Sequence, residues 1–133
     1  MNDENNKYYD LHTTGIGYLQ SIREVEPEES EPAPLVVVIA ALRGRLGDVQ
    51  YTHFECDVTG RKAQATVREL QSAVEGKLKV LIGFTLSNLH AEPFTFKGGE
   101  KDGQTSVHLK ARLLRISYAK VEGQPFMTGQ TAR

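Results

Sequence analysis

The sequence predicts a mainly β domain in which one helix interrupts a series of five strands. Several apolar segments are rich in β-branched residues or alternate apolar with polar residues, as strands do. One segment changes to the helical period of apolar residues. The length of 133 residues suits a single domain, and no internal repeat is visible.

The first strand is predicted over residues 14–25, where apolar residues alternate. Gly15 and Gly17 within it allow a sharp bend. Residues 26–34 follow as an acidic, proline-rich stretch. Because proline cannot donate a hydrogen bond to a neighbouring strand, we expect these residues to form a loop.

The second and third strands are predicted as a hairpin. Residues 35–45 form a continuous β-branched run, typical of a strand that is buried over much of its length. Residues 45–48 predict a tight turn in which Gly47 takes the unusual backbone angles. Residues 49–58 alternate, which places Phe54, Cys56 and Val58 on one face and Tyr51, His53, Glu55 and Asp57 on the other.

A helix is predicted over residues 59–76. Thr59 can serve as its N-cap, and Gly76 stands where a C-terminal glycine is favoured. The spacing of its apolar residues by four, three and four gives one buried stripe, formed by Ala63, Val67, Leu70 and Val74.

Two further strands complete the chain. Residues 79–86 read as the fourth strand, and the segment after it is less regular, with Pro93 marking a break or an edge. Residues 97–105 form a turn by composition. Residues 106–118 alternate as a long fifth strand, and the residues that follow look frayed.

Five strands with one helix between the third and the fourth is the topology of the five-stranded oligonucleotide-binding (OB) barrel. The helix would close one end of the barrel, and a protruding hairpin would join the last two strands. The expected organisation is a flexible arm over 1–13, the domain over 14–120 with its acidic loop at 26–34, and a flexible tail over 121–133.

The net charge of −1 is unevenly distributed. Residues 1–34 carry eight acids and two bases, whereas residues 35–133 carry fourteen bases and nine acids. A moderately basic body permits a polyanionic partner without requiring one. The polar N-terminus does not resemble a secretory signal, no apolar run could span a membrane, and a single cysteine suits a reducing compartment, so we expect a cytoplasmic protein with no membrane partner.

The layout resembles bacterial single-stranded DNA-binding protein. The order "YTHFECDV", glycine, helix, "GKLKVLIGFTL", "FTFKGGEKDGQT" and "SVHLKARLL" follows that family's pattern at similar spacing. The resemblance implies an OB barrel that binds single-stranded DNA. The chain departs from the family in having no tryptophan and in ending "MTGQTAR" without an acidic tip, so a role in recruiting replication partners is not expected.

A second resemblance covers almost the whole chain. "YYDLHTTGIGYLQSIREV", "IAALRG", "GFTLSNLHAEPFTF" and "GQTSVHLKARLL" are similar to a family of small proteins encoded on bacterial integrative and conjugative elements and genomic islands. That family is catalogued as a domain of unknown function and is often labelled an element replication protein. It implies a role in replication or transfer of a mobile genetic element.

Binding of a single strand requires a cationic groove with aromatic faces, because each base offers a π-face and each nucleotide a charge. In OB barrels this groove lies over the second and third strands. Glu55 and Asp57 flank it and predict a modest affinity, for which a homo-oligomer could compensate. The candidate contact residues are Arg43, Arg45, Tyr51, His53, Phe94, Phe96, Lys97, Lys101, Lys110 and Arg112.

Other chemistries find little support in the sequence. His53 and Cys56 lie on opposite faces of a strand and cannot share one metal ion without a bulge, so no metal or other cofactor is expected. The glycine-rich segments lack the Gly-Lys-Ser/Thr ending of a phosphate-binding loop, and no nucleophile is placed beside a base, so we do not expect an enzyme.

Several alternatives remain open at this level. Phe94 and Phe96 could be core residues, and the basic strand face could serve solubility alone. The barrel could also be a protein-protein assembly module without nucleic-acid affinity, with its edge strands and the Phe94–Phe96 segment as the interface. RNA could replace DNA as the ligand. The glutamates of residues 26–31 could also fold over the basic face and compete with nucleic acid, although a solubilising loop explains them as well.

Overall fold

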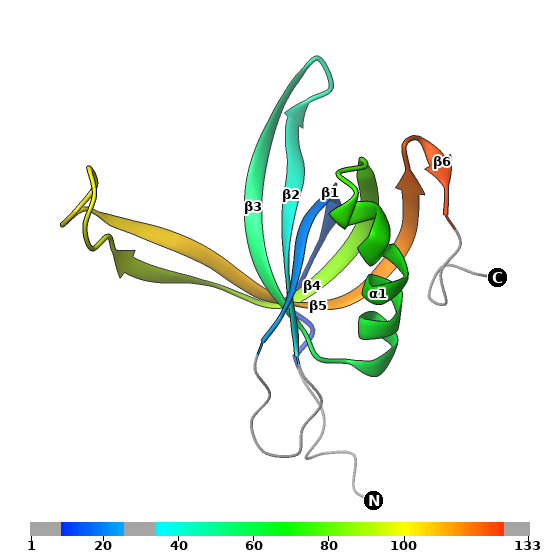
Figure 1. Ribbon diagram of the computed structural model, residues 1–133, viewed down its shortest axis with the longest axis horizontal. Coiled ribbons are helices and arrows are strands. Elements are labelled where there is room, and N and C mark those ends of the chain that lie inside the picture. Colours follow the sequence, from blue (N-terminus) through cyan, green and yellow to red (C-terminus); the bar gives the residue numbers. More distant parts are fainter. Residues whose placement is uncertain (1–8, 26–33, 127–133) are drawn as a thin grey trace, which may run out of the picture.

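The computed structural model describes residues 9–25 and 34–126 of the chain. Within these residues six strands form one sheet and one helix packs against it (Figure 1). The fold is therefore mainly β with a helix between the third and fourth strands, as the sequence predicts. Most of the predicted arm and tail, and the glutamates of the predicted acidic loop, lie outside the described residues.

The first three strands form an antiparallel meander. Strand β1 spans His12–Glu24, β2 spans Leu35–Arg45 and β3 spans Asp48–Val58. The register of β1 against β2 shifts between Leu19 and Ser21, which leaves an extra residue on β1. The β2–β3 hairpin is regular from Leu35 opposite Val58 to Arg45 opposite Asp48.

Strands β4 and β5 close the sheet into a ring, and β6 adds to the outer end of β5. Strand β4 spans Val80–Thr95, β5 spans Thr105–Val121 and the short β6 spans Gln124–Pro125. β4 pairs with β1 on one side and with β5 on the other, and β5 also pairs in parallel with β3 at residues 110–112. Strands β1, β2, β3, β5 and β4 therefore follow one another around a closed ring.

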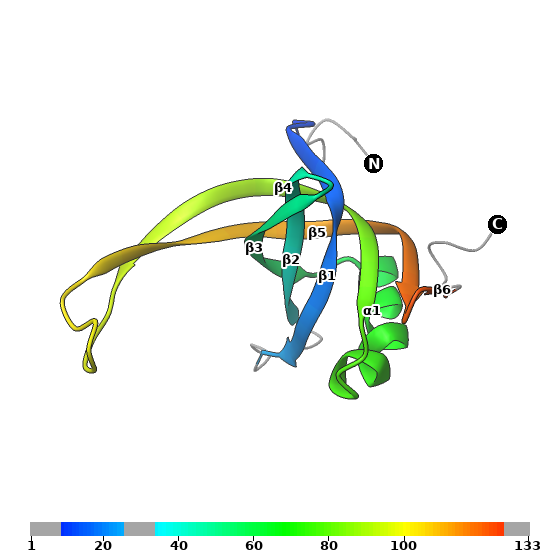
Figure 2. The same cartoon turned by 90° about the horizontal axis from the view of Figure 1, so that it is seen from above.

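Helix α1, Arg61–Glu75, buries one stripe against the core of the ring (Figure 2). Its buried residues are Ala63, Val67, Leu70 and Val74, as the spacing predicts, together with Thr66. These side chains pack with the inward residues of β2, β3, β4 and β5. The described part of the chain contains no helix with the length and apolar character that crossing a bilayer requires.

The backbone corrects the predicted N-cap of α1 and the predicted left-handed residue of the β2–β3 turn, and it confirms the predicted C-cap. The N-cap of α1 is Gly60, not Thr59, and no side chain caps it. Gly76 is the C-cap, as predicted, and the left-handed backbone angles occur at the next residue, Lys77. In the β2–β3 hairpin these angles occur at Gly44 rather than at Gly47. Composition identified the correct turns but not the residues that take the left-handed angles.

Beyond Ser87, β4 and β5 leave the ring as a two-stranded arm, residues 88–110 (Figures 1 and 2). The arm projects on the side of the ring opposite α1. A bulge at its base places Asn88 and Leu89 between the residues paired with Arg112 and Lys110. Pro93 does not break β4, which pairs through it with β5; the proline lies where β4 has no neighbour on its other side.

The single cysteine is part of the core. Cys56 is fully buried, and burial together with Asp57 and Glu55 raises the pKa of its thiol to about 12. The group therefore stays protonated near neutral pH. Exposed His53 lies on the opposite face of β3, as alternation predicts.

Candidate nucleic-acid interface

The outer face of β3 carries exposed aromatic side chains. Phe54 and Cys56 point into the core, which turns Tyr51 and His53 outward. Tyr51 is 47% exposed, and His53 is exposed as well. Tyr51 and His53 are planar side chains on the same face of β3, and nucleic-acid bases can stack on such rings.

The arm carries a second aromatic group on its outer face. The rings of Phe94 and His108 are stacked, with centroids 4.1 Å apart and an interplanar angle of 16°. Phe96 meets Phe94 edge to face at 4.9 Å. The ammonium of Lys101 lies 5.3 Å from the centroid of Phe96. Three rings and a cation are thus gathered near the end of the arm.

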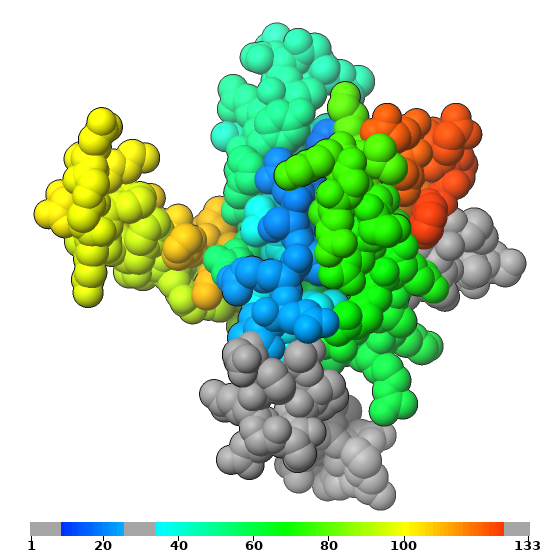
Figure 3. All heavy atoms as spheres, in the orientation of Figure 1, coloured from blue at the N-terminus to red at the C-terminus, as the bar shows by residue number. Residues whose placement is uncertain are grey.

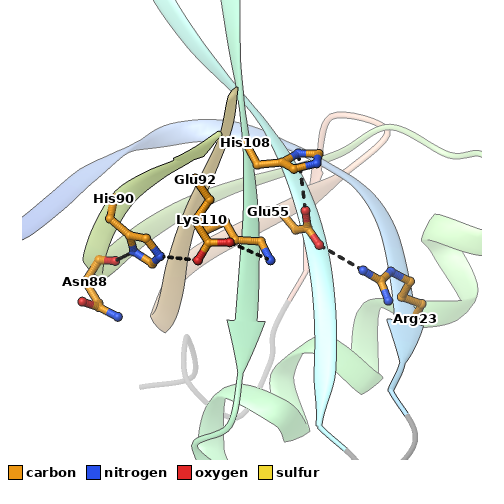
Figure 4. Close-up of polar contacts among 7 residues, drawn as sticks. All are labelled: Arg23, Glu55, Asn88, His90, Glu92, His108 and Lys110. Atoms are coloured by element: carbon orange, nitrogen blue, oxygen red, sulfur yellow. Dashed lines mark hydrogen bonds and ion pairs between the residues drawn. The ribbon is translucent and has the colours of Figure 1, made fainter. Parts of the chain in front are cut away.

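The two aromatic groups meet at Glu55. Its carboxylate accepts a hydrogen bond of 3.0 Å from Arg23 on β1 and lies 3.9 Å from Nδ1 of His108 on β5 (Figure 4). Glu55 and Lys110 are neighbours in the parallel β3–β5 pairing. The outer face therefore continues from Tyr51 and His53, past a carboxylate paired with an arginine, to the rings of the arm.

The base of the arm holds a polar network on the same face. Nδ1 of His90 lies 2.7 Å from the backbone oxygen of Asn88, and Nε2 lies 2.9 Å from the Glu92 carboxylate (Figure 4). Lys110 lies 3.7 Å from the same carboxylate. Both nitrogens of the His90 ring face acceptors, and only the protonated ring can donate from both. These contacts raise the pKa of His90. The larger effect comes from the hydrogen bond to the Asn88 backbone oxygen, and the next from the hydrogen bond to Glu92.

We expect the Glu92→Gln substitution to lower the pKa of His90. Neutralising the carboxylate removes a charged acceptor, while the bond to Asn88 remains, so the pKa should move only part of the way toward 6.5. The raised pKa of His90 stabilises the fold below the unfolded-state pKa, and this contribution is lost as the pH rises through the folded-state value. NMR titration of His90 checks the shift, with Glu100→Gln as a control. An unchanged His90 pKa in Glu92→Gln would contradict the assigned contact.

Four of the predicted cations lie near the arm. Lys97 and Lys101 are exposed at its tip. Lys110 is half-buried beside Glu92, and Arg112 is half-buried next to Asp57 in the parallel pairing. Alternation along β5 places His108, Lys110 and Arg112 outward, opposite the buried Ala111 and Leu113, as predicted. The arm thus combines aromatic faces with positive charge.

The arginines at the end of β2 lie elsewhere. Arg43 donates hydrogen bonds to Thr52 at 2.8 Å and to Gln50 at 2.7 Å, on the face of the hairpin that continues the core side. Tyr51 is on the opposite face of the same hairpin. Arg45 is exposed two residues beyond Arg43, at the hairpin turn. The structure does not bring Arg43 together with the rings on β3.

Sequence reasoning missed Tyr18, Lys77 and Lys79, which lie beside the rings of β3. Tyr18 on β1 is in one row across the sheet with Ala40 on β2 and His53 on β3. Tyr18 therefore lies on the outer face together with His53. The connection between α1 and β4 brings Lys77 and Lys79 to the same hollow as Tyr18 and Tyr51. Tyr18 and Leu19 are neighbours in an apolar segment, and only the strand pairing shows that Tyr18 points outward while Leu19 is buried in the core.

Metal ligation and curated relatives give no further assignment. Within residues 9–25 and 34–126, no group of three or more His, Cys, Asp or Glu side chains could hold a metal ion.

No curated protein and no solved structure matches the chain. The sequence model of one family, described as a protein of unknown function (DUF3577), matches residues 2–133. The chain therefore belongs to the DUF3577 family.

Proposed function

We propose that this protein is an OB-fold domain that binds single-stranded DNA without sequence specificity. The closed ring of β1, β2, β3, β5 and β4, with α1 between β3 and β4, supports the OB assignment. The observation that carries the function is the outer face. Exposed rings on β3 continue to the stacked rings of the arm, with lysines beside them.

The aromatic faces suit bases in single strands. A duplex keeps its bases stacked on one another, whereas a single strand can place each base on a protein ring. The half-buried Phe94 and Phe96 and the exposed His108 and Tyr51 all stand on the outer face. Stacking on these rings does not select one base, because every base has a π-face, which favours non-specific binding.

The charges indicate moderate affinity. The cations near the rings are few, and Glu55 lies in the middle of the face. Its pairing with Arg23 at 3.0 Å reduces the repulsion of phosphates. We therefore propose that Lys97, Lys101, Lys110 and Arg112 contact the phosphates. The biological role that we propose, implied by the sequence resemblance, is replication or transfer of a mobile element.

Titration of a fluorescently labelled oligothymidine by anisotropy tests the function. We expect binding at low salt, with the logarithm of affinity falling by about 3 per logarithmic unit of salt if four phosphates are contacted. A duplex of equal length should bind more weakly. An RNA of matching sequence decides between RNA and DNA as ligand. Absence of binding at low salt would reject the function, and salt-independent binding would reject the phosphate contacts.

A second candidate is a protein-protein assembly module. Ile16 on β1 and Tyr118 on β5 are 39% and 38% exposed on the outer surface of the ring. Both are cross-strand partners of Gly83 on β4, one on each side of it. The Tyr118 ring lies against Gly83, where an added Cβ would come within 2.6 Å of it. Such an exposed apolar patch suits a protein partner or a second copy. Self-association in sedimentation experiments, with no binding to any oligonucleotide, would favour this candidate.

A further inference from the structure

A hollow of about 470 Å³ opens beside the rings of β3, outside the residues proposed above for the arm. It lies at the β1 register shift, between the β2–β3 hairpin and the connection from α1 to β4. Figure 3 shows the green α1–β4 connection and the teal hairpin on either side of the blue β1. The volume falls in the range of small-molecule sites, roughly 300 to 1,000 Å³.

The lining of this hollow combines three chemical characters. Tyr18, Tyr51 and His53 supply aromatic walls, and buried core side chains of β1, α1 and β4 form an apolar floor. Exposed Lys77 and Lys79 stand at its rim. Among the residues that the structure describes, no carboxylate lines it; the nearby Glu122 carboxylate instead accepts a hydrogen bond from the backbone N–H of Lys79. The hollow therefore suits a ligand that is flat and apolar at one end and anionic at the other.

The backbone at the rim is strained at one of these lysines. The helix ends with Leu78 N–H donating to the Ala73 oxygen and Lys77 N–H donating to the Val74 oxygen, both at 3.0 Å. This C-terminal motif requires left-handed angles at Lys77, whose φ is 65°. Glycine is the residue usually found there. Gly76 is next to it with an ordinary φ of −80°, so the chain places a lysine where glycine would fit better.

We propose that this hollow binds one nucleotide, with its base against Tyr18, Tyr51 and His53 and its phosphate at Lys77 and Lys79. The inference rests on the proposed function, because it extends the path of a bound strand from the arm, past Glu55, to the end of β3. The aromatic base of a nucleotide suits the aromatic walls, and its phosphate, held at a distance by the sugar, suits the lysines at the rim. A free nucleotide has the same chemistry, and the experiment below separates the two sources.

The Lys77→Gly substitution separates binding from folding. Glycine accepts left-handed angles without strain, so the melting temperature should equal or exceed that of the wild type. Affinity for the labelled oligothymidine should nevertheless fall by about fivefold, as expected when one exposed ion pair with a phosphate is lost. Lys62→Gln removes one exposed lysine from α1, which does not line the hollow, and should leave affinity unchanged.

A parallel titration with thymidine 5′-monophosphate, followed by NMR of His53 and the tyrosines, identifies the source. Displacement of the nucleotide by oligothymidine, together with weaker oligonucleotide binding by Lys77→Gly, supports a nucleotide of a bound strand. Nucleotide binding without any oligonucleotide binding supports a free nucleotide and rejects the proposed function. If Lys77→Gly binds oligothymidine with wild-type affinity, the proposal that the hollow holds a nucleotide is wrong, and the proposed function is unaffected. Absence of both kinds of binding overturns both.

Discussion

Replacement of Phe94 by alanine should weaken binding of a single-stranded oligonucleotide by about 10- to 100-fold. Phe94 stacks on His108 at 4.1 Å and contacts Phe96 at 4.9 Å, so its loss removes one ring and releases two others. Stacking of one base on an aromatic side chain contributes roughly 1 to 3 kcal/mol. Fluorescence anisotropy with labelled oligothymidine at low salt measures the change.

Val107 provides a matched control for Phe94. It lies on the opposite face of the same arm and is 52% exposed, so Val107→Ala removes apolar surface without touching the rings. We expect its affinity to equal that of the wild type. Thermal unfolding of both variants shows whether the arm and ring remain folded. Equal affinities of Phe94→Ala and wild type, with both proteins folded, would remove the arm from the interface.

Replacement of Gly17 by alanine should destabilise the protein by about 3 kcal/mol, the upper range for overpacking a core. A Cβ at this position would lie 2.6 Å from the Ala40 backbone oxygen and 2.7 Å from the Ala41 Cα. Both atoms belong to the backbone of β2, so no side chain can rotate away to make room. Because β1 also pairs with β4, a shift of β1 would disturb the whole ring. Chemical denaturation measures the loss.

Gly47→Ala is the control for this prediction. Gly47 lies in the β2–β3 turn, and a Cβ there would meet no atom within 4 Å. Its φ is not in the left-handed region, so alanine should change stability by less than about 0.5 kcal/mol. If Gly17→Ala were as stable as Gly47→Ala, β1 and β2 could not approach one another as closely as the structure places them.

Much of the helix and sheet could be predicted from local pattern. The stripe of α1 was correct because its four buried apolar residues repeat at the helical period, and β2 was correct to the residue because its β-branched run is uninterrupted. The ends were less predictable. β4 continues to Thr95, past the residue where its apolar pattern stops, because pairing with β5 sustains a strand that has no core to face.

The candidate site divides in the same way. Alternation predicted that Tyr51 and His53 share one face of β3, and that His108, Lys110 and Arg112 share one face of β5. It could not predict that Arg43 turns to Thr52 and Gln50, since the direction of an arginine at the end of a strand depends on its cross-strand neighbours.

By itself the sequence determined the class of the fold, the order of its elements and which residues share a face, because these follow from the periods of strand and helix. Tertiary structure decided which faces meet. The parallel pairing of β3 with β5 brings Glu55 to His108 and joins two aromatic groups whose nearest members, His53 and Phe94, are 41 residues apart in the chain. The pairing of Tyr18 with Leu81 of β4 places Tyr18 near the α1–β4 connection, whose Lys77 and Lys79 line the same hollow. Contacts between distant segments depend on packing of the whole ring, which no local period encodes.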